Sequence, residues 1–363
     1  MRSAYSCWGI NITILLSICL LGCKKEASDG NLDPGGLYTV KFIEEVPWAG
    51  SWVRRLKDKI IFIADANYKE YGQSGVYDPA SNKVEKLTLR GAGGSTVVLG
   101  DNYLVLAGGS SGPGKFFLNA RIVDINDMSI NVGEISKGRN SIVGVAHRDF
   151  MMFAGGTISY GENDLAFSNV IDVFTPSNNW TVEKLSVERA YIAGASAGGK
   201  IIFAGGLNND GASDVVDIFD VEKKMWSTAK LSVPRYNIGA TVVGDYVLLA
   251  GGDTEAYRYS KIIDIYNVKT NEWTTESLSQ ERSSLTAITV GNKAVFIGGF
   301  LAKDSNADNR YSRVIDIFDP FTKKMGRAEL RKEDIMHGES VSVGNKFYVP
   351  TSVKTTDVYE LQE

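Results

Sequence analysis

The stretch KIIFAGGLNNDGASDVVDIFDVEKKMWSTAKLSVPR, residues 200–235, contains the features that decide the fold of this chain. An apolar run ends in the doublet Gly205–Gly206, a polar loop leads to VVDIF, Trp226 follows, and Arg235 begins the next round. The same order recurs along almost everything downstream of the N-terminal tail. Such repetition is typical of a fold built from stacked copies of one supersecondary unit.

The glycine doublets mark the period of this repeat. They begin at residues 108, 155, 205, 251 and 298, with gaps of 47, 50, 46 and 47 residues. A turn signal and a short, fully apolar run precede each doublet, which predicts a hairpin whose second strand is buried on both faces. We expect the glycines to allow positive φ and close backbone approach where that strand ends. They are Gly108, Gly109, Gly155, Gly156, Gly205, Gly206, Gly251, Gly252, Gly298 and Gly299.

Three further columns follow from aligning the repeats. The segments IVDIN, VIDVF, VVDIF, IIDIY and VIDIF place an aspartate in one column, at Asp124, Asp172, Asp217, Asp264 and Asp316. A large aromatic plug follows at Trp180, Trp226 and Trp273, and we expect these rings to fill the space between units. An arginine stands sixteen residues before four of the doublets, at Arg139, Arg189, Arg235 and Arg282.

Glycine doublet, aromatic residue, tryptophan and leading arginine, in this order, resemble the kelch repeat, whose period is about 50 residues. The resemblance covers residues from about 37 to the end of the sequence. It implies a four-stranded antiparallel blade for each repeat and a β-propeller overall.

The ends of the chain decide the expected number of blades. Residues 59–65 and 75–77 match the second and third strands of a first blade, and residues 346–359 match those of a last one that lacks its outer strand. The strand-like residues 37–43 supply that strand, with Thr39 in the tryptophan column. We therefore predict an all-β, seven-bladed kelch-type propeller whose N-terminal strand closes the C-terminal blade, so that no sheet edge remains open.

The first 36 residues predict an export signal and a tether. Residues 10–21 form an apolar stretch that is too short to span a bilayer and is typical of a signal-peptide core. The sequence LLGC that ends at Cys23 resembles the lipobox of bacterial lipoproteins, which implies cleavage before Cys23 and its acylation, for example with palmitate. The alternative is a plain membrane-anchor helix with an incidental cysteine. We expect a signal peptide at 1–22, a flexible tether at 23–36 and the propeller domain at 37–363.

This resemblance implies a partner membrane and a location. The protein would be lipid-anchored to the outer membrane, on its periplasmic or cell-surface side, and we expect a monomer. The formal net charge of −4 provides no basic field, so nucleic acid is not an expected partner. All three cysteines lie within the first 23 residues, which leaves none in the propeller for a disulfide, a metal thiolate or a nucleophile.

No cofactor or metal is expected from the motifs. Asp304, Asn306 and Asp308 have the spacing of a calcium loop, but Asn309 replaces the turn glycine and the twelfth position carries no glutamate, so an ordinary polar loop is favoured. His147 is expected as a solvated residue of a turn, and His337 begins the last inner strand, where it could approach the central channel.

The two faces of the predicted propeller differ in their connections. The loop face carries the links between blades and the long, variable loops after the glycine doublets, whereas the turn face carries tight turns. Variable loops on a rigid scaffold usually carry recognition, so the loop face is the expected binding face. Its candidate ligand-binding residues are Arg139, Arg189, Arg235, Arg282, Tyr191 and Tyr236, because guanidinium groups suit carboxylates and aromatic rings provide stacking surfaces. The alternative is that the arginines belong to the repeat and bond to the backbone between blades.

Two functions remain open from the sequence. The first is a non-catalytic, membrane-anchored module that binds a glycan or a protein through the loop face. The second is a carbohydrate isomerase or epimerase similar to sialic-acid mutarotases, which are six-bladed kelch propellers; the arginines would hold a carboxylate beside Glu188 or Glu281. Galactose-oxidase-like activity is excluded, because that family needs a cysteine crosslinked to a tyrosine.

Overall fold

The structure is a computed structural model. It describes residues 38–47, 52–65, 74–91, 96–100, 102–110, 115–148, 150–161, 164–175, 177, 179–255, 258–301, 311–331, 339–352 and 355–362. The signal peptide, Cys23, most of the tether, His337 and residues 304–309 lie outside these ranges. In the described part of the chain, no helical segment has the length and apolarity needed to cross a bilayer.

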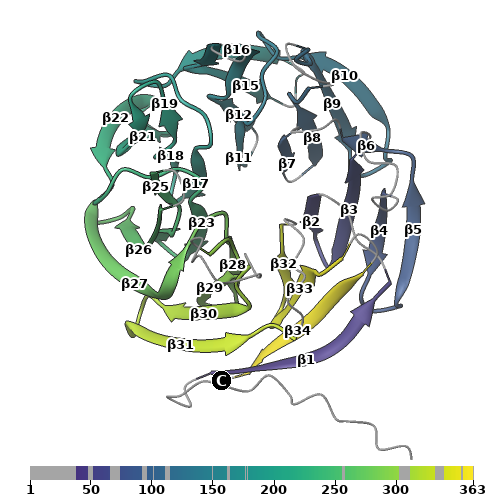
Figure 1. The fold of residues 1–363 in the computed structure, drawn as a ribbon. Coiled ribbons are helices and arrows are strands. Elements are labelled where there is room, and N and C mark those ends of the chain that lie inside the picture. Colours follow the sequence, from purple (N-terminus) through teal and green to yellow (C-terminus); the bar gives the residue numbers. More distant parts are fainter. Residues whose placement is uncertain are drawn as a thin grey trace, which may run out of the picture.

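Seven antiparallel sheets stand around a central channel as the blades of a propeller (Figure 1). The strands of the first four blades, from the channel outward, follow. They are β2 (Trp52–Leu56), β3 (Lys59–Asp65), β4 (Ser74–Asp78) and β5 (Lys83–Leu87); β7 (Thr96–Leu99), β8 (Tyr103–Ala107), β9 (Asn119–Asp124) and β10 (Ile130–Glu134); β11 (Val143–His147), β12 (Phe150–Ala154), β15 (Val170–Thr175) and β16 (Asn179–Lys184); β17 (Ala193–Ala197), β18 (Lys200–Ala204), β21 (Val215–Asp220) and β22 (Met225–Lys230).

The remaining three blades complete the ring. They are β23 (Gly239–Val243), β24 (Tyr246–Ala250), β26 (Arg258–Asn267) and β27 (Glu272–Arg282); β28 (Thr286–Val290), β29 (Lys293–Ile297), β30 (Val314–Asp319) and β31 (Lys324–Glu329); β32 (Val341–Val343), β33 (Lys346–Pro350), β34 (Thr356–Gln362) and β1 (Thr39–Val46). Shorter strands extend some blades on one face: β6 (Arg90–Gly91), β13 (Thr157–Gly161), β14 (Asp164–Phe167), β19 (Leu207–Asn208), β20 (Gly211–Ala212) and β25 (Asp253–Glu255). The all-β, seven-bladed prediction is confirmed.

The hydrophobic core lies between neighbouring blades. The predicted second strands are buried on both faces, and Ile201, Ile202 and Phe203 of β18 have no exposed surface. Ile202 packs in one cluster with Val247 of the next blade, whereas Ile201 packs with residues of the preceding blade. Trp226 joins that second cluster, with its ring centroid 4.9 Å from that of Phe219. The tryptophan thus fills inter-blade space, as the sequence predicted.

The first glycine of each doublet cannot be replaced without a clash. Gly205 has a φ of 63°, and a Cβ added there would lie 2.3 Å from the carbonyl oxygen of Arg235. The first blade avoids this turn, because β3 continues through the doublet position and its Ala64 and Asp65 pair with β6. The doublet therefore serves the close contact between a strand end and the following link.

The N-terminal strand closes the ring, as predicted. Strand β1 pairs with β34 from Thr39 opposite Gln362 to Val46 opposite Thr356 (Figure 1). The expected position of Thr39 is wrong, however: Phe42 lies opposite Tyr359, as Trp226 lies opposite Phe219. Phe42 stands 22 residues before the doublet position at Ala64, whereas Trp226 stands 25 before Gly251, so counting backward from a regular blade misses by three.

The second blade also departs from the expected alignment. Asp172 lies opposite Phe153, two residues before its doublet, but the corresponding Leu106 lies opposite Arg121 and not Asp124. Asp124 instead accepts the main-chain N–H of Asn126 at 2.9 Å, in the turn after the strand. A carboxylate that caps its own turn produced the resemblance between IVDIN and VIDVF.

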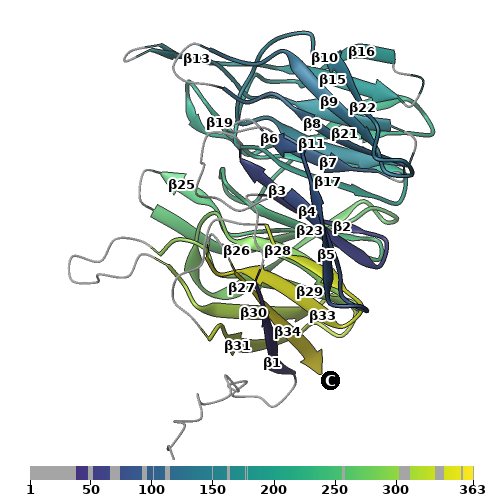
Figure 2. The ribbon, with the colours of Figure 1, turned by 90° about the vertical axis from the view of Figure 1, so that its right-hand side faces the viewer.

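The two faces follow the predicted division. The hairpin of β13 and β14, the hairpin of β19 and β20, and β25 project on the loop face, and the C-terminal end of β34 lies on the opposite side (Figure 2). An outer strand runs from the turn face to the loop face, so β1 begins at Thr39 on the turn face.

Candidate functional site

The four arginines predicted to bind ligand are completely buried. Arg139, Arg189, Arg235 and Arg282 have no exposed surface, and each forms an ion pair with an aspartate of the blade that it precedes. The Nη2 atom of Arg189, for example, lies 2.8 Å from Oδ2 of Asp217. No guanidinium group of this set reaches the loop face, so the expected ligand-binding role is corrected to a structural one.

Arg235 shows what this role is. Its Nη1 donates to the carbonyl oxygens of Gly251 at 2.7 Å and Ile262 at 2.8 Å, and its Nη2 donates to Asp264. Asp264 also accepts the main-chain N–H of Ser232 at 3.2 Å. Burial lowers the pKa of Arg235, and the Asp264 carboxylate opposes that shift. The pair therefore ties the link that leaves one blade to the second and third strands of the next blade.

The two predicted tyrosines remain on the loop face. Tyr191 and Tyr236 are half-buried, and their ring centroids are 6.4 Å apart in a tilted arrangement. Burial raises the pKa of Tyr236, and the nearby Asp253 carboxylate raises it further. Tyr191 adopts a φ of 55°, a conformation shared by Ser141, Asn237 and Ser284 at the same position of their repeats. These residues form the rim where the inner strands begin.

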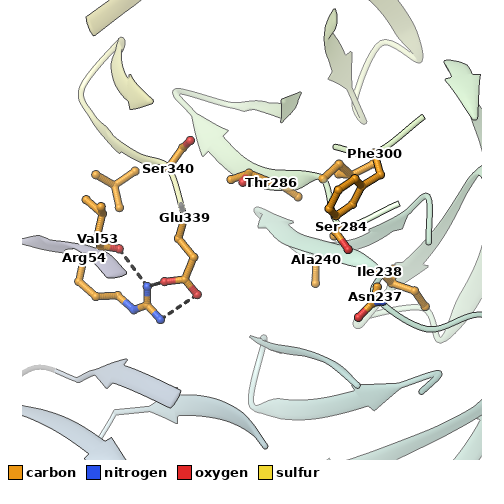
Figure 3. A pocket seen from close by; sticks show the side chains of 14 residues that line it. Val53, Arg54, Asn237, Ile238, Ala240, Ser284, Thr286, Phe300, Glu339 and Ser340 are labelled. Carbon is orange, nitrogen blue, oxygen red and sulfur yellow. Dashed lines mark hydrogen bonds and ion pairs between the residues drawn. The ribbon is translucent and has the colours of Figure 1, made fainter. Parts of the chain in front are cut away.

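The largest described cavity lies at this rim, in the loop-face mouth of the central channel. It has a volume of about 680 Å³, and its wall includes Arg54, Asn237, Ser284, Phe300 and Glu339 (Figure 3). Asn237, Ser284 and Glu339 directly precede the inner strands β23, β28 and β32. The repeat therefore brings one side chain per blade to the same opening.

Two further cavities adjoin the first one. A cavity of about 420 Å³ shares Arg54, Ala240 and Glu339 with it and extends to Tyr191. A cavity of about 560 Å³ shares Ser340 and Val341 and extends along the channel toward the turn face. The channel thus offers connected space from the loop-face mouth inward.

An ion pair between Arg54 and Glu339 stands at the junction of these cavities (Figure 3). Arg54 Nη2 donates to Glu339 Oε1 at 3.1 Å, and Nη1 donates to the carbonyl oxygen of Val53 at 2.9 Å. Desolvation lowers the pKa of Arg54 to about 10, so the guanidinium group stays protonated at neutral pH. The pair joins the first blade to the last one.

A buried carboxyl group lies beside the mouth. Asp253 is 8% exposed and accepts hydrogen bonds from Asn237 Nδ2 at 3.0 Å and from the Ser283 hydroxyl. Burial raises the pKa of Asp253, and the two hydrogen bonds oppose this. Other repeats have Ser110, Thr157, Leu207 or Phe300 at this position after the doublet. Asp253 connects the rim residues of two neighbouring blades.

Sequence reasoning missed Arg54, Glu339 and Asp253. The signal for Arg54 was available, because its pairing position on the inner strand is occupied by Val145, Ala195, Thr241, Ile288 and Val341 in other blades. A comparison restricted to the strongest repeat columns does not show a charge that occurs once. Glu188 and Glu281, which were expected near the arginines, are exposed and line none of the three cavities.

His147 differs from expectation. It belongs to β11 rather than to a turn, is half-buried, and its Nδ1 lies 2.8 Å from the hydroxyl of Ser196 on the next inner strand. It therefore links two blades. Within the described residues, no group of three or more His, Cys, Asp or Glu side chains is placed to hold a metal ion.

Comparisons with known proteins agree with this architecture. The kelch motif model matches residues 234–277, which run from the link before the fifth blade into its outer strand. A solved structure entitled "Structure of YjhT" covers 75% of this chain and 97% of its own, with a TM-score of 0.56 and 14% identity. No protein with a curated description matches the sequence. The likeness to YjhT concerns the fold alone. The chain is a seven-bladed β-propeller of the kelch-repeat type.

Proposed function

We propose that this protein is a lipid-anchored binding module that takes a glycan, or the end of a protein chain, into the loop-face mouth of its channel. The observation that carries the proposal is the cavity of about 680 Å³ on the expected binding face. Concave sites of this size, in which a few polar groups converge on an otherwise apolar wall, are typical of ligand recognition.

The composition of the wall favours a glycan over a protein. The mouth combines the amide of Asn237, the hydroxyl of Ser284 and the Arg54–Glu339 pair with the ring of Phe300 (Figure 3). Hydroxyl-rich ligands need both donors and acceptors, and an aromatic face suits the apolar side of a sugar ring. The Phe300 ring is itself supported by Tyr311, with the centroids 5.2 Å apart.

The position of the chain's first described residues supports an anchor on the other face. Strand β1 begins at Thr39 on the turn face, so a tether that ends before it would leave the loop face pointing away from the membrane. The anchor has its own check: Cys23→Ser should move the protein from the membrane fraction to the soluble fraction. Retention of that variant in the membrane would contradict lipidation at Cys23.

The isomerase alternative loses the residues that motivated it. Its carboxylate was to be held by the four repeat arginines, and these are buried in ion pairs. An enzyme acting on an acidic sugar would need a different residue set in the channel.

A glycan and peptide array probed with the purified domain tests the proposal. We expect binding of at least one glycan class, and at least about a tenfold loss with Ala240→Phe, because a large side chain there fills space shared by two cavities. Met225→Ala is the matched control, since Met225 is exposed on the outer strand of the fourth blade. Absence of any bound ligand, or binding that Ala240→Phe leaves unchanged, would count against the mouth as the site.

A further inference from the structure

Arg54 is a charge that the propeller architecture does not require. The corresponding inner-strand position is neutral in the other blades, and those blades form the same sheet. A cation facing the channel loses part of its hydration, which is unfavourable unless a partner compensates it. A residue type that occurs once in a repeated column and lines two cavities is a candidate for ligand recognition.

Ring closure does not explain the Arg54–Glu339 pair. Strand β1 already closes the last blade along its length. The first and last blades also share an apolar cluster that contains Val53, Ile60, Tyr348 and Val358. A partly exposed ion pair adds little to a contact of this kind, typically less than about 1 kcal/mol.

The two partners differ in how firmly they are held. The Arg54 side chain is 21% exposed, and one of its nitrogen atoms is fixed by the Val53 carbonyl oxygen. The Glu339 side chain is 50% exposed and reaches in from the segment before β32. Glu339 therefore leaves the pair at a smaller desolvation cost than Arg54 would, and a carboxylate from outside meets the same guanidinium geometry.

Ser340 provides a second polar group at this place. It is 5% exposed, and its Oγ is a buried hydroxyl for which the described residues and their hydrogen bonds offer no partner. Ser340 lines both the mouth cavity and the cavity that continues toward the turn face. A buried hydroxyl without a partner is unfavourable, and a ligand oxygen within the channel would satisfy it.

We infer that the channel mouth binds a carboxylate-bearing ligand through Arg54 and Ser340, and that Glu339 occupies the carboxylate position in the free protein. This inference rests on the proposed function and names the ligand's chemical class. A bidentate guanidinium–carboxylate pair fixes the orientation of the acid, and the Ser340 hydroxyl donates to a further ligand oxygen. Glu339 acts as an internal competitor that selects against ligands without a negative charge.

Calorimetric titration of the full chain with D-glucuronate, succinate and D-glucose tests the inference. We expect both acids, or the sugar acid alone, to bind at millimolar concentrations and D-glucose to bind at least about tenfold more weakly. Glu339→Gln should tighten acid binding about two- to fivefold, which is the range that loss of one partly exposed ion pair allows, and should leave D-glucose unchanged. The two acids distinguish a sugar acid from a simple carboxylate as the source of the recognised group.

Arg54→Gln should abolish the preference for acids, and thermal melts show whether this variant is folded. Glu339→Gln keeps the inference falsifiable if Arg54→Gln does not fold, because a pair that only joined two blades would lower the melting temperature without changing acid affinity. Acids that do not bind to Glu339→Gln would overturn the inference. If a neutral glycan then still binds and Ala240→Phe blocks it, the proposed function stands while the carboxylate site falls.

Discussion

Blades three to six and blades one, two and seven share one strand order but differ in their buried polar groups. The first set, here called the regular blades, each bury an Arg–Asp pair. In the second set, the divergent blades, the aspartate position holds Gly75 in the first blade, exposed Arg121 in the second and Asp357 in the seventh. The apolar second and third strands therefore suffice for a blade, and the ion pair serves the attachment of the preceding link.

The seventh blade shows a substitute for the regular pair. Asp357 is buried and lies 3.1 Å from Nη2 of Arg331, which is one-third exposed and follows β31. The same guanidinium lies 3.3 Å from Glu45 and 4.0 Å from the Phe42 ring centroid, both on β1. The blade that the N-terminal strand closes thus uses one arginine to hold both the incoming link and the closing strand.

The largest expected effect separates the seventh blade from all others. A chain that begins at residue 50 lacks β1, so it loses the buried Val40 and Val46 and the contact of Phe42 with Tyr359. At about 1.5–3 kcal/mol for each buried side chain, the loss exceeds about 5 kcal/mol, and the cooperative transition in denaturant should disappear. If this shortened chain melts like the full domain, closure by β1 does not hold the ring.

The next effect compares a regular blade with a divergent one. Asp264→Ala leaves the Arg235 guanidinium buried without its carboxylate, and we expect the free energy of unfolding to fall by about 3–5 kcal/mol. Arg121→Ala is the matched control at the equivalent position of the second blade, where the side chain is exposed, and should change stability by less than about 1 kcal/mol. Urea titration measures both, and equal losses would show that the two sets do not differ as described.

The smallest effect concerns Asp253, a buried carboxyl whose described partners are neutral donors. Burial raises its pKa, so the folded state favours the protonated form and loses stability as the pH rises through the folded-state pKa. Asp253→Asn keeps an acceptor but removes this dependence. At neutral pH it should be at least as stable as the native chain, with a difference within about 1 kcal/mol that shrinks as the pH falls. A large destabilisation at neutral pH would show that the charge itself is needed.

The comparison extends to the candidate site. Regular blades use their arginines between strands, where no ligand can reach them. The first and seventh blades, which lack that pattern, supply Arg54 and Glu339 to the channel mouth. Divergence from the repeat therefore coincides with the charges that remain accessible, and a search for functional residues in such a fold should begin with the positions that break the repeat.

The sequence by itself determined the propeller, the number of blades and their closure. Glycine doublets, apolar strands and aromatic plugs act within one blade or between adjacent blades, so their period is visible along the chain. Registers in the divergent blades escaped, because Asp124 imitates a repeat position with a turn-capping carboxylate and because the link after Phe42 is shorter.

Only the tertiary structure decided which charges are buried and which face the channel. Arg235 and Arg54 have the same chemistry, but the first lies between strands beside Asp264 and the second lies at the mouth beside Glu339. Arg54 and Glu339 are 285 residues apart and meet only because the ring closes. Burial and pairing depend on contacts between distant segments, and no local pattern encodes them.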